Sequence, residues 1–269
     1  MLRRSFATKD KVGKMTKPSK KTLREPVKAK LQQQHHHQME SPPLGSTLTS
    51  TIVTIAVGPT RRLFACHEDV LCLSPFFSAA LRGAFVESQL KQVELPEEEP
   101  EVFSSVLEYL YKGDYYPRLL IDKRRNTWSL EDTTASNGRG CVESTVYSQR
   151  SGGVILKDTA IYCAAEMFGL DELKRIALRK QGLQTGIQID VILRSARFAY
   201  ENTPEQDAKL RAHYLALIIR SRKAFKRSGT MQMEMELGGS KLFFDLFVAM
   251  CNHIDDVVDL VNVSSPKSI

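Results

Sequence analysis

Five cysteines and six histidines are the side chains of this 269-residue chain best suited to metal binding or nucleophilic chemistry. The cysteines are odd in number and scattered, at Cys66, Cys72, Cys141, Cys163 and Cys251. None belongs to the close C-x-x-C pairs that zinc sites and redox centres use. We therefore predict reduced thiols in an intracellular compartment, with no bound metal and no cofactor.

Catalytic constellations are equally absent from the sequence. Cys66 and His67 are chain neighbours, whereas a nucleophile and its base normally meet across a fold. The four glutamates between residues 97 and 101 point in different directions around an expected helix start, where negative charge suits the helix dipole. The chain contains no G-x-S-x-G, P-loop or H-E-x-x-H pattern. We therefore predict that the protein is not an enzyme.

The net charge of +7 is concentrated at the N-terminus. Residues 1–50 carry 11 basic and 3 acidic residues, against 27 and 28 in the remainder. Residues 1–49 contain few large apolar side chains, which predicts a disordered basic tail. This tail could bind nucleic acid, an import receptor or an acidic surface, or it could be merely solvated. Its opening residues could alternatively start a mitochondrial presequence, and its run His35–His37 could hold a metal weakly.

Alternating apolar and polar residues predict the first folded elements. Strands are expected at residues 52–57 and 62–66 as a hairpin, with a third at 92–95. Ser74-Pro75 predicts a helix start, because Ser caps and Pro fits the first turn. Apolar spacing from Phe103 to Tyr111 predicts another helix, which ends at Lys112-Gly113.

The second half of the sequence divides into a polar segment and a helical one. Residues 117–157 are rich in Gly, Ser, Thr, Asn and charge, which favours a disordered insert. A helix pair is expected at about 160–178, followed by helices near 187–201, 205–225 and 240–261. Residues 229–239 are expected to form a loop or a short helix. No apolar run reaches the roughly 18 residues of a membrane span, so we expect no membrane insertion and a location in the nucleus or cytoplasm.

Taken together in order and spacing, several motifs resemble the BTB/POZ signature of stand-alone, fungal-type proteins. They are Phe64-Ala-Cys-His67, Ser74-Pro-Phe-Phe77, Val93-Glu-Leu95 and Leu110-Tyr-Lys-Gly-Asp-Tyr115, with Ile161–Leu173 similar to the closing helix pair. The resemblance implies an α+β fold in which a small β-sheet is flanked by a helical cluster. It would cover residues 50–180, interrupted by the insert, with a C-terminal helical extension at residues 181–264.

The resemblance also implies a function in binding proteins, as a homodimer or on a cullin-3 ubiquitin-ligase scaffold. Cullin-binding relatives carry a hydrophobic residue, any residue, then Glu before the third strand, which here reads Phe85-Val86-Glu87. An exposed Phe85 and Glu87 would anchor a partner helix together with Tyr111. Alternatively Phe85 packs in the core and Glu87 is solvated. We predict a protein-interaction adaptor, with substrate delivery to a cullin-3 type ligase as the finer hypothesis.

Two other functions stay open. The protein could be a nuclear scaffold or a transcription-associated protein whose basic tail contacts nucleic acid. A related fold also serves as a channel-associated tetramerisation module, which the lack of a membrane span disfavours.

Overall fold

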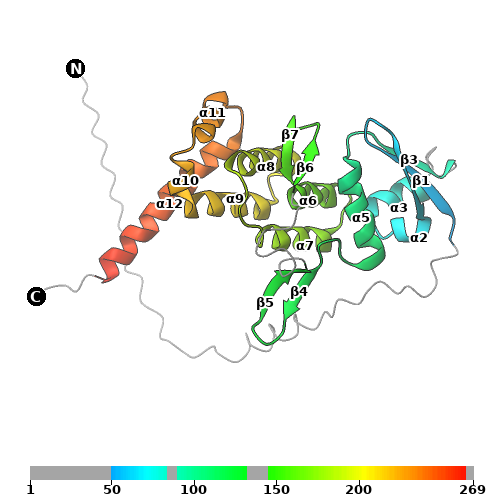
Figure 1. Cartoon of the computed structure of the whole chain (residues 1–269), viewed down its shortest axis with the longest axis horizontal. Coiled ribbons are helices and arrows are strands. Elements are labelled where there is room, and N and C mark those ends of the chain that lie inside the picture. Colours follow the sequence, from blue (N-terminus) through cyan, green and yellow to red (C-terminus); the bar gives the residue numbers. More distant parts are fainter. Residues whose placement is uncertain (1–49, 84–89, 132–144, 265–269) are drawn as a thin grey trace, which may run out of the picture. The chain divides into compact units, whose positions relative to one another are not determined.

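The computed structural model describes residues 50–83, 90–131 and 145–264, with side chains described through residue 260 (Figure 1). The predicted disordered tail at residues 1–49 lies outside these ranges. The described part is an α+β fold in which small sheets accompany many helices. Its first half holds a three-stranded sheet, and its second half is mainly helical.

The three predicted strands form one mixed sheet in the order β2-β1-β3. β1 (Ile52–Val57) pairs antiparallel with β2 (Arg62–His67) and parallel with β3 (Gln92–Leu95). Gly58 follows β1 with φ +75°, a conformation that glycine adopts without strain. The hairpin and the third strand are therefore confirmed.

Helices α2 (Glu68–Leu71), α3 (Pro75–Arg82) and α5 (Pro100–Lys112) accompany this sheet. The Ser74 hydroxyl accepts a hydrogen bond from the N–H of Phe77 and donates one to the carbonyl of Phe168, 2.6 Å away. Gly113 ends α5 with φ +76°. Both helix boundaries agree with the capping residues that predicted them.

Helices α6 (Lys157–Met167) and α7 (Asp171–Gln181) close this half of the fold. Phe168, directly after α6, stacks on Phe77 of α3 with ring centroids 5.0 Å apart. Phe103 of α5 meets both rings edge-on. All three rings are fully buried, so one aromatic cluster joins α3, α5 and the end of α6.

The prediction of a disordered insert at residues 117–157 is wrong for the parts of this range that the structure describes. β4 (Leu119–Asp122) pairs with β5 (Thr127–Leu130), and β6 (Thr145–Ser148) pairs with β7 (Gly153–Leu156). The second hairpin is held because Val146 and Ile155 are buried in the core and β7 packs against α8 (Ile189–Asn202). Residues 132–144 lie outside the described ranges.

The C-terminal extension contains α8, α9 (Ala208–Arg220), α10 (Arg222–Phe225), α11 (Gly229–Leu237) and α12 (Lys241–Ser264). The helix expected at 205–225 is interrupted at Ser221, whose ψ of 18° departs from helical geometry. The segment at 229–239 is a short helix rather than a loop. None of the helices in the described ranges is long and apolar enough to cross a membrane.

Candidate protein-interaction surfaces

Of the three predicted contact residues, only Tyr111 belongs to the described part of the chain. Phe85 and Glu87 fall within residues 84–89, outside the described ranges. Tyr111 lies at the end of α5 and is half-buried. Its hydroxyl accepts the backbone N–H of His67 at 3.0 Å and lies 2.7 Å from the Nδ1 of that histidine. The Tyr111–His67 contact therefore ties the end of α5 to the end of β2.

Two charged residues close to positions 84–89 in the chain each form an ion pair with α2. Arg82, at the end of α3, pairs with Asp69 at 3.4 Å, and Lys91, just before β3, pairs with Glu68 at 3.0 Å. Both carboxylates belong to α2, which begins directly after His67. Arg82 and Lys91, the charged residues nearest in the chain to positions 84–89 on either side, therefore both contact α2.

The other tyrosines near Tyr111 do not form one continuous aromatic surface. Tyr109 is half-buried and Tyr116 is 41% exposed. Tyr115 is fully buried, and its hydroxyl donates to Asp158 at 2.7 Å. Tyr115 is therefore part of the core and not of a contact surface.

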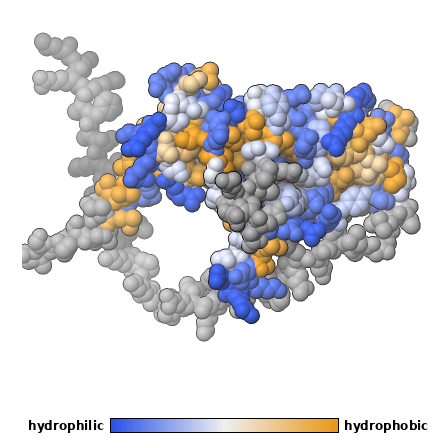
Figure 2. All heavy atoms as spheres, viewed as in Figure 1, coloured by the Kyte–Doolittle hydropathy of each residue, from blue (hydrophilic) through white to orange (hydrophobic). Residues whose placement is uncertain are grey.

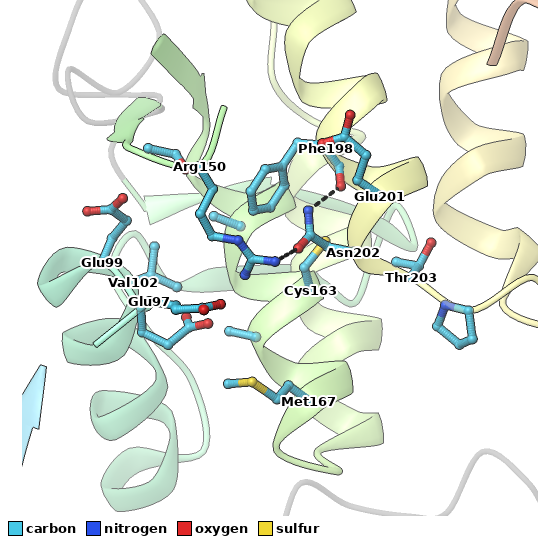
Figure 3. A pocket seen from close by; sticks show the side chains of 15 residues that line it. Glu97, Glu99, Val102, Arg150, Cys163, Met167, Phe198, Glu201, Asn202 and Thr203 are labelled. Atoms are coloured by element: carbon cyan, nitrogen blue, oxygen red, sulfur yellow. Dashed lines mark hydrogen bonds between the residues drawn. The ribbon is translucent and has the colours of Figure 1, made fainter. Parts of the chain in front are cut away.

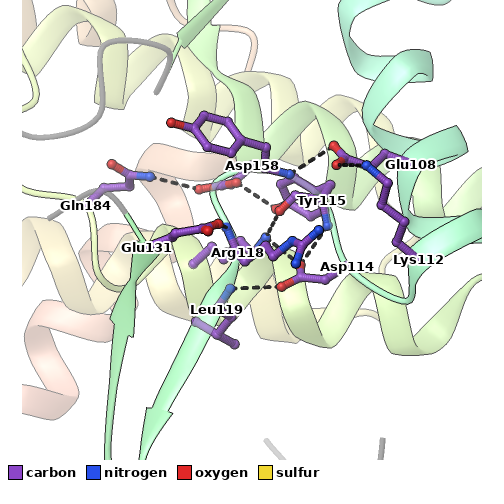
Figure 4. A network of polar contacts seen from close by, with 11 residues as sticks. Glu108, Lys112, Asp114, Tyr115, Arg118, Leu119, Glu131, Asp158 and Gln184 are labelled. Carbon is purple, nitrogen blue, oxygen red and sulfur yellow. Dashed lines mark hydrogen bonds and ion pairs between the residues drawn. The ribbon is translucent and has the colours of Figure 1, made fainter. Parts of the chain in front are cut away.

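A buried polar network surrounds Tyr115 (Figure 4). The Lys180 ammonium is fully buried, bonds the Asp114 carboxylate and the Tyr115 carbonyl, and lies 3.5 Å from the centre of the Tyr115 ring. Asp114 also accepts the N–H groups of Tyr115 and Leu119, at 2.7 and 2.8 Å. The Asp114 carboxylate neutralises the charge of the Lys180 ammonium, and the oxygens of Asp114 accept hydrogen bonds. The free-energy cost of burying these polar groups is therefore offset.

The same network extends toward the C-terminal helices. Asp158 accepts from Gln184 at 3.2 Å, and neighbouring Thr159 donates to Gln181 and lies 2.6 Å from the hydroxyl of Tyr214 on α9. Burial raises the pKa of Asp158, raises that of Tyr115 well above its ordinary value, and lowers the pKa of Lys180. The network thus joins the chain after α5 to α6, α7 and α9.

A cleft of about 430 Å³ opens between the start of α5, α6, the β6–β7 hairpin and the end of α8 (Figure 3). Its walls carry Glu97, Glu98, Glu99 and Glu201. Arg150 extends across it, bonds the side chain of Asn202 and lies 5.8 Å from the ring centre of Phe198. Glu99 accepts the N–H of Gln149 at 2.7 Å, so this carboxylate holds the hairpin.

Burial shifts the pKa of two titratable groups that line this cleft, Cys163 and Glu98. Cys163 is buried, and burial raises the pKa of its thiol far above the ordinary value, which keeps it protonated and a poor nucleophile. Burial likewise raises the pKa of Glu98. Outside the cleft, on β2, burial raises the pKa of Cys66 to about 11. Within the described ranges, no group of three or more His, Cys, Asp or Glu side chains is arranged to hold a metal ion.

The mixed sheet and the short helices around it form an α+β fold that is consistent with a BTB/POZ domain. Residues 49–123 match the family model described as BTB/POZ domain, so the chain contains a BTB/POZ domain, which is a protein-interaction module and not an enzyme family. Over 62 residues the chain is 39% identical to Kelch-like protein 30 of Mus musculus. That match covers 23% of this chain and 10% of the mouse protein.

Proposed function

We propose that the protein is an adaptor whose BTB/POZ domain docks on a cullin-3 type scaffold. The arrangement around α2 carries this proposal. Arg82 and Lys91, which lie in the chain on either side of Phe85-Val86-Glu87, each form an ion pair with a carboxylate of α2. The residue directly before α2 is His67, which is hydrogen-bonded to Tyr111. In this proposal one helix of the partner contacts the ring of Phe85, the carboxylate of Glu87 and the edge of the Tyr111 ring.

The similarity to a Kelch-like protein over 62 residues also supports the adaptor hypothesis. Proteins of the BTB/POZ kind bind other proteins, and this chain carries a helical extension after that domain. In the adaptor hypothesis the extension or the N-terminal basic residues would present a second partner, the substrate of the ligase.

Isothermal titration calorimetry of the full chain against a purified cullin-3 N-terminal domain tests the docking. We expect micromolar or tighter binding that Phe85→Ala and Glu87→Ala each weaken by about 30-fold or more, because hot-spot truncations cost about 2 kcal/mol or more. Tyr111→Phe should weaken binding less, since it keeps the ring and removes only the hydroxyl bonded to His67.

Leu63→Ala supplies a matched control. Leu63 is 67% exposed and apolar and lies on β2, whereas the proposed contact involves α2, α5 and residues 84–89. It should bind the cullin domain as the wild type does. If the folded wild type does not bind, or if Leu63→Ala weakens binding as much as Phe85→Ala, the cullin hypothesis is wrong and a self-associating scaffold becomes the working proposal.

A further inference from the structure

A second hollow lies within the C-terminal extension, remote in sequence from the residues proposed to bind a cullin. It has a volume of about 1140 Å³ and runs between α12 and the segment from α9 to α11. Its walls are largely apolar and include Met250, Ile254 and Val257 on α12 and Phe225, Met231 and Met235 opposite. We call this hollow the α12 groove.

Much of the apolar surface of α12 has no cover within the described part of the chain. Only Leu242 and Leu246 are buried, whereas Ile254 is 57%, Val257 45% and Val258 49% exposed. Figure 2 shows hydrophobic residues along the distal half of this helix. Contiguous exposed apolar surface of this kind marks an interaction site in a folded protein.

The groove has a mainly basic rim: Arg222, Lys223, Lys226 and Arg227 line it together with one carboxylate, that of Glu236. None of these four cations pairs with a carboxylate within the described ranges. The distal half of α12 carries the opposite charge, in Asp255, Asp256 and Asp259, which are all exposed. These carboxylates likewise form no ion pair among the residues that the structure describes.

The chain therefore contains both a groove with a basic rim and an acidic helix with an apolar stripe. We propose that the α12 groove binds α12 of a second copy of the chain. In a two-fold arrangement each copy would supply one groove and one helix, so the contact would be made twice. The Met and Ile side chains would cover one another, and the aspartates of each copy would meet the basic rim of the other.

Charge argues against other occupants. Residues 1–49 have the same sign as the rim and would be repelled. An anionic membrane would attract the rim but repel the three aspartates that lie beside the apolar stripe. A helix with an apolar stripe and acidic residues complements both the apolar walls and the basic rim of the groove, and α12 is such a helix.

The first test compares two valine substitutions in the full chain. Val257 lines the groove and is 45% exposed, whereas Val248 is on the same helix, is 40% exposed and does not line it. Sedimentation equilibrium should show a dimer for the wild type. Val257→Asp should weaken the dimer about 100-fold, because the change enters a symmetric interface twice. Val248→Asp should change the dimer dissociation constant by less than about threefold.

The second test exchanges charges between groove and helix. Lys223→Glu, Lys226→Glu and Arg227→Glu together make the rim acidic, and Asp255→Lys with Asp259→Lys makes the helix basic, so each of these two variants alone should be monomeric. Mixing the two variants should restore a dimer, because each rim then meets a helix of opposite sign. Circular dichroism checks that every variant keeps its helix content.

Several results would overturn the proposal. They are a wild-type monomer at 100 µM, equal weakening by Val248→Asp and Val257→Asp, and no dimer on mixing. Binding to phosphatidylserine vesicles that Val257→Asp abolishes, with the free protein monomeric, would make the groove a membrane site instead. Cullin binding should be unchanged in Val257→Asp, so failure of this interface and failure of the cullin contact are distinguishable.

Discussion

The buried ion pair between Lys180 and Asp114 yields the prediction that follows most directly from the structure. Lys180→Met keeps the length and apolar stem of the side chain and removes the ammonium. Breaking a buried pair by removing one partner typically costs about 3–5 kcal/mol. Asp114 keeps two backbone N–H donors and is 13% exposed, so part of its solvation survives. We therefore expect a loss of about 2–3 kcal/mol.

Urea unfolding followed by circular dichroism measures that loss, and a thermal scan should show a fall in Tm of about 5–10 °C for a chain of this size. Asp114→Asn is the matched variant. It leaves a fully buried cation without its anion, so it should cost more, about 3–5 kcal/mol. The double variant should cost less than the sum of the two, because the single variants disrupt the same pair.

The pH dependence supplies an independent check on Lys180. Burial lowers its pKa, so just below pH 10.5 the native state binds fewer protons than the unfolded state. Stability contributed by this group therefore rises with pH through that window, and Lys180→Met should lose the rise. A loss below about 0.5 kcal/mol in Lys180→Met, or strict additivity with Asp114→Asn, would refute the argument that the network stabilises the fold.

Three further predictions concern the core and the tail. The pKa of Cys66 is raised by burial to about 11, so wild-type stability should fall by about 2 kcal/mol between pH 9 and 11 relative to Cys66→Ala, measured by urea unfolding across that range. Phe168→Ala should lose about 3–5 kcal/mol in the same assay, whereas Phe76→Ala, at a ring that is 36% exposed, should lose clearly less. If residues 1–49 bind nucleic acid, fluorescence anisotropy should show affinity for duplex DNA falling at least about tenfold between 50 and 200 mM salt, and salt-independent binding would contradict phosphate contact.

The sequence predicted the elements whose signals are local. Alternation marked β1 and β2, Ser74 and Gly113 marked helix ends, and Val93 lies in the third strand as expected. These signals act within a few residues, so they can be recognised without knowing the fold. The cap at Ser74 also donates to Phe168, 94 positions away, and that partner was not predictable from the cap itself.

The hairpins within residues 117–157 were missed because tertiary contacts stabilise them. Polar and glycine-rich composition suggested disorder, yet Trp128 lies 4.3 Å from the Arg179 guanidinium of α7, and the N–H of Leu156 donates to Ser195 of α8 at 2.8 Å. Lys180 was missed for a similar reason. A lysine in the last turn of an amphipathic helix normally faces solvent, and here Asp114, 66 positions earlier, and the carbonyl of Tyr115 make its burial tolerable.

The site residues show where sequence reasoning stops. Tyr111 is half-buried and bound to His67, and the Phe85 and Glu87 contact stays a prediction outside the described ranges. The basic rim and the aspartates of α12 were visible as charges, but only the packing of α9 to α12 places them around one apolar groove. Helical periodicity predicted the helices and left open whether they packed on the core.

The two proposed surfaces share no residue, which makes their combination testable by stoichiometry. The cullin contact would involve α2, α5 and residues 84–89, and the self-contact would involve α9 to α12. If both hold, a dimer binds two cullin domains, and calorimetry should give one cullin per chain at concentrations above and below the dimer dissociation constant. A ratio of one cullin per dimer would mean that the two contacts obstruct each other, and Val257→Asp should then raise it to one per chain.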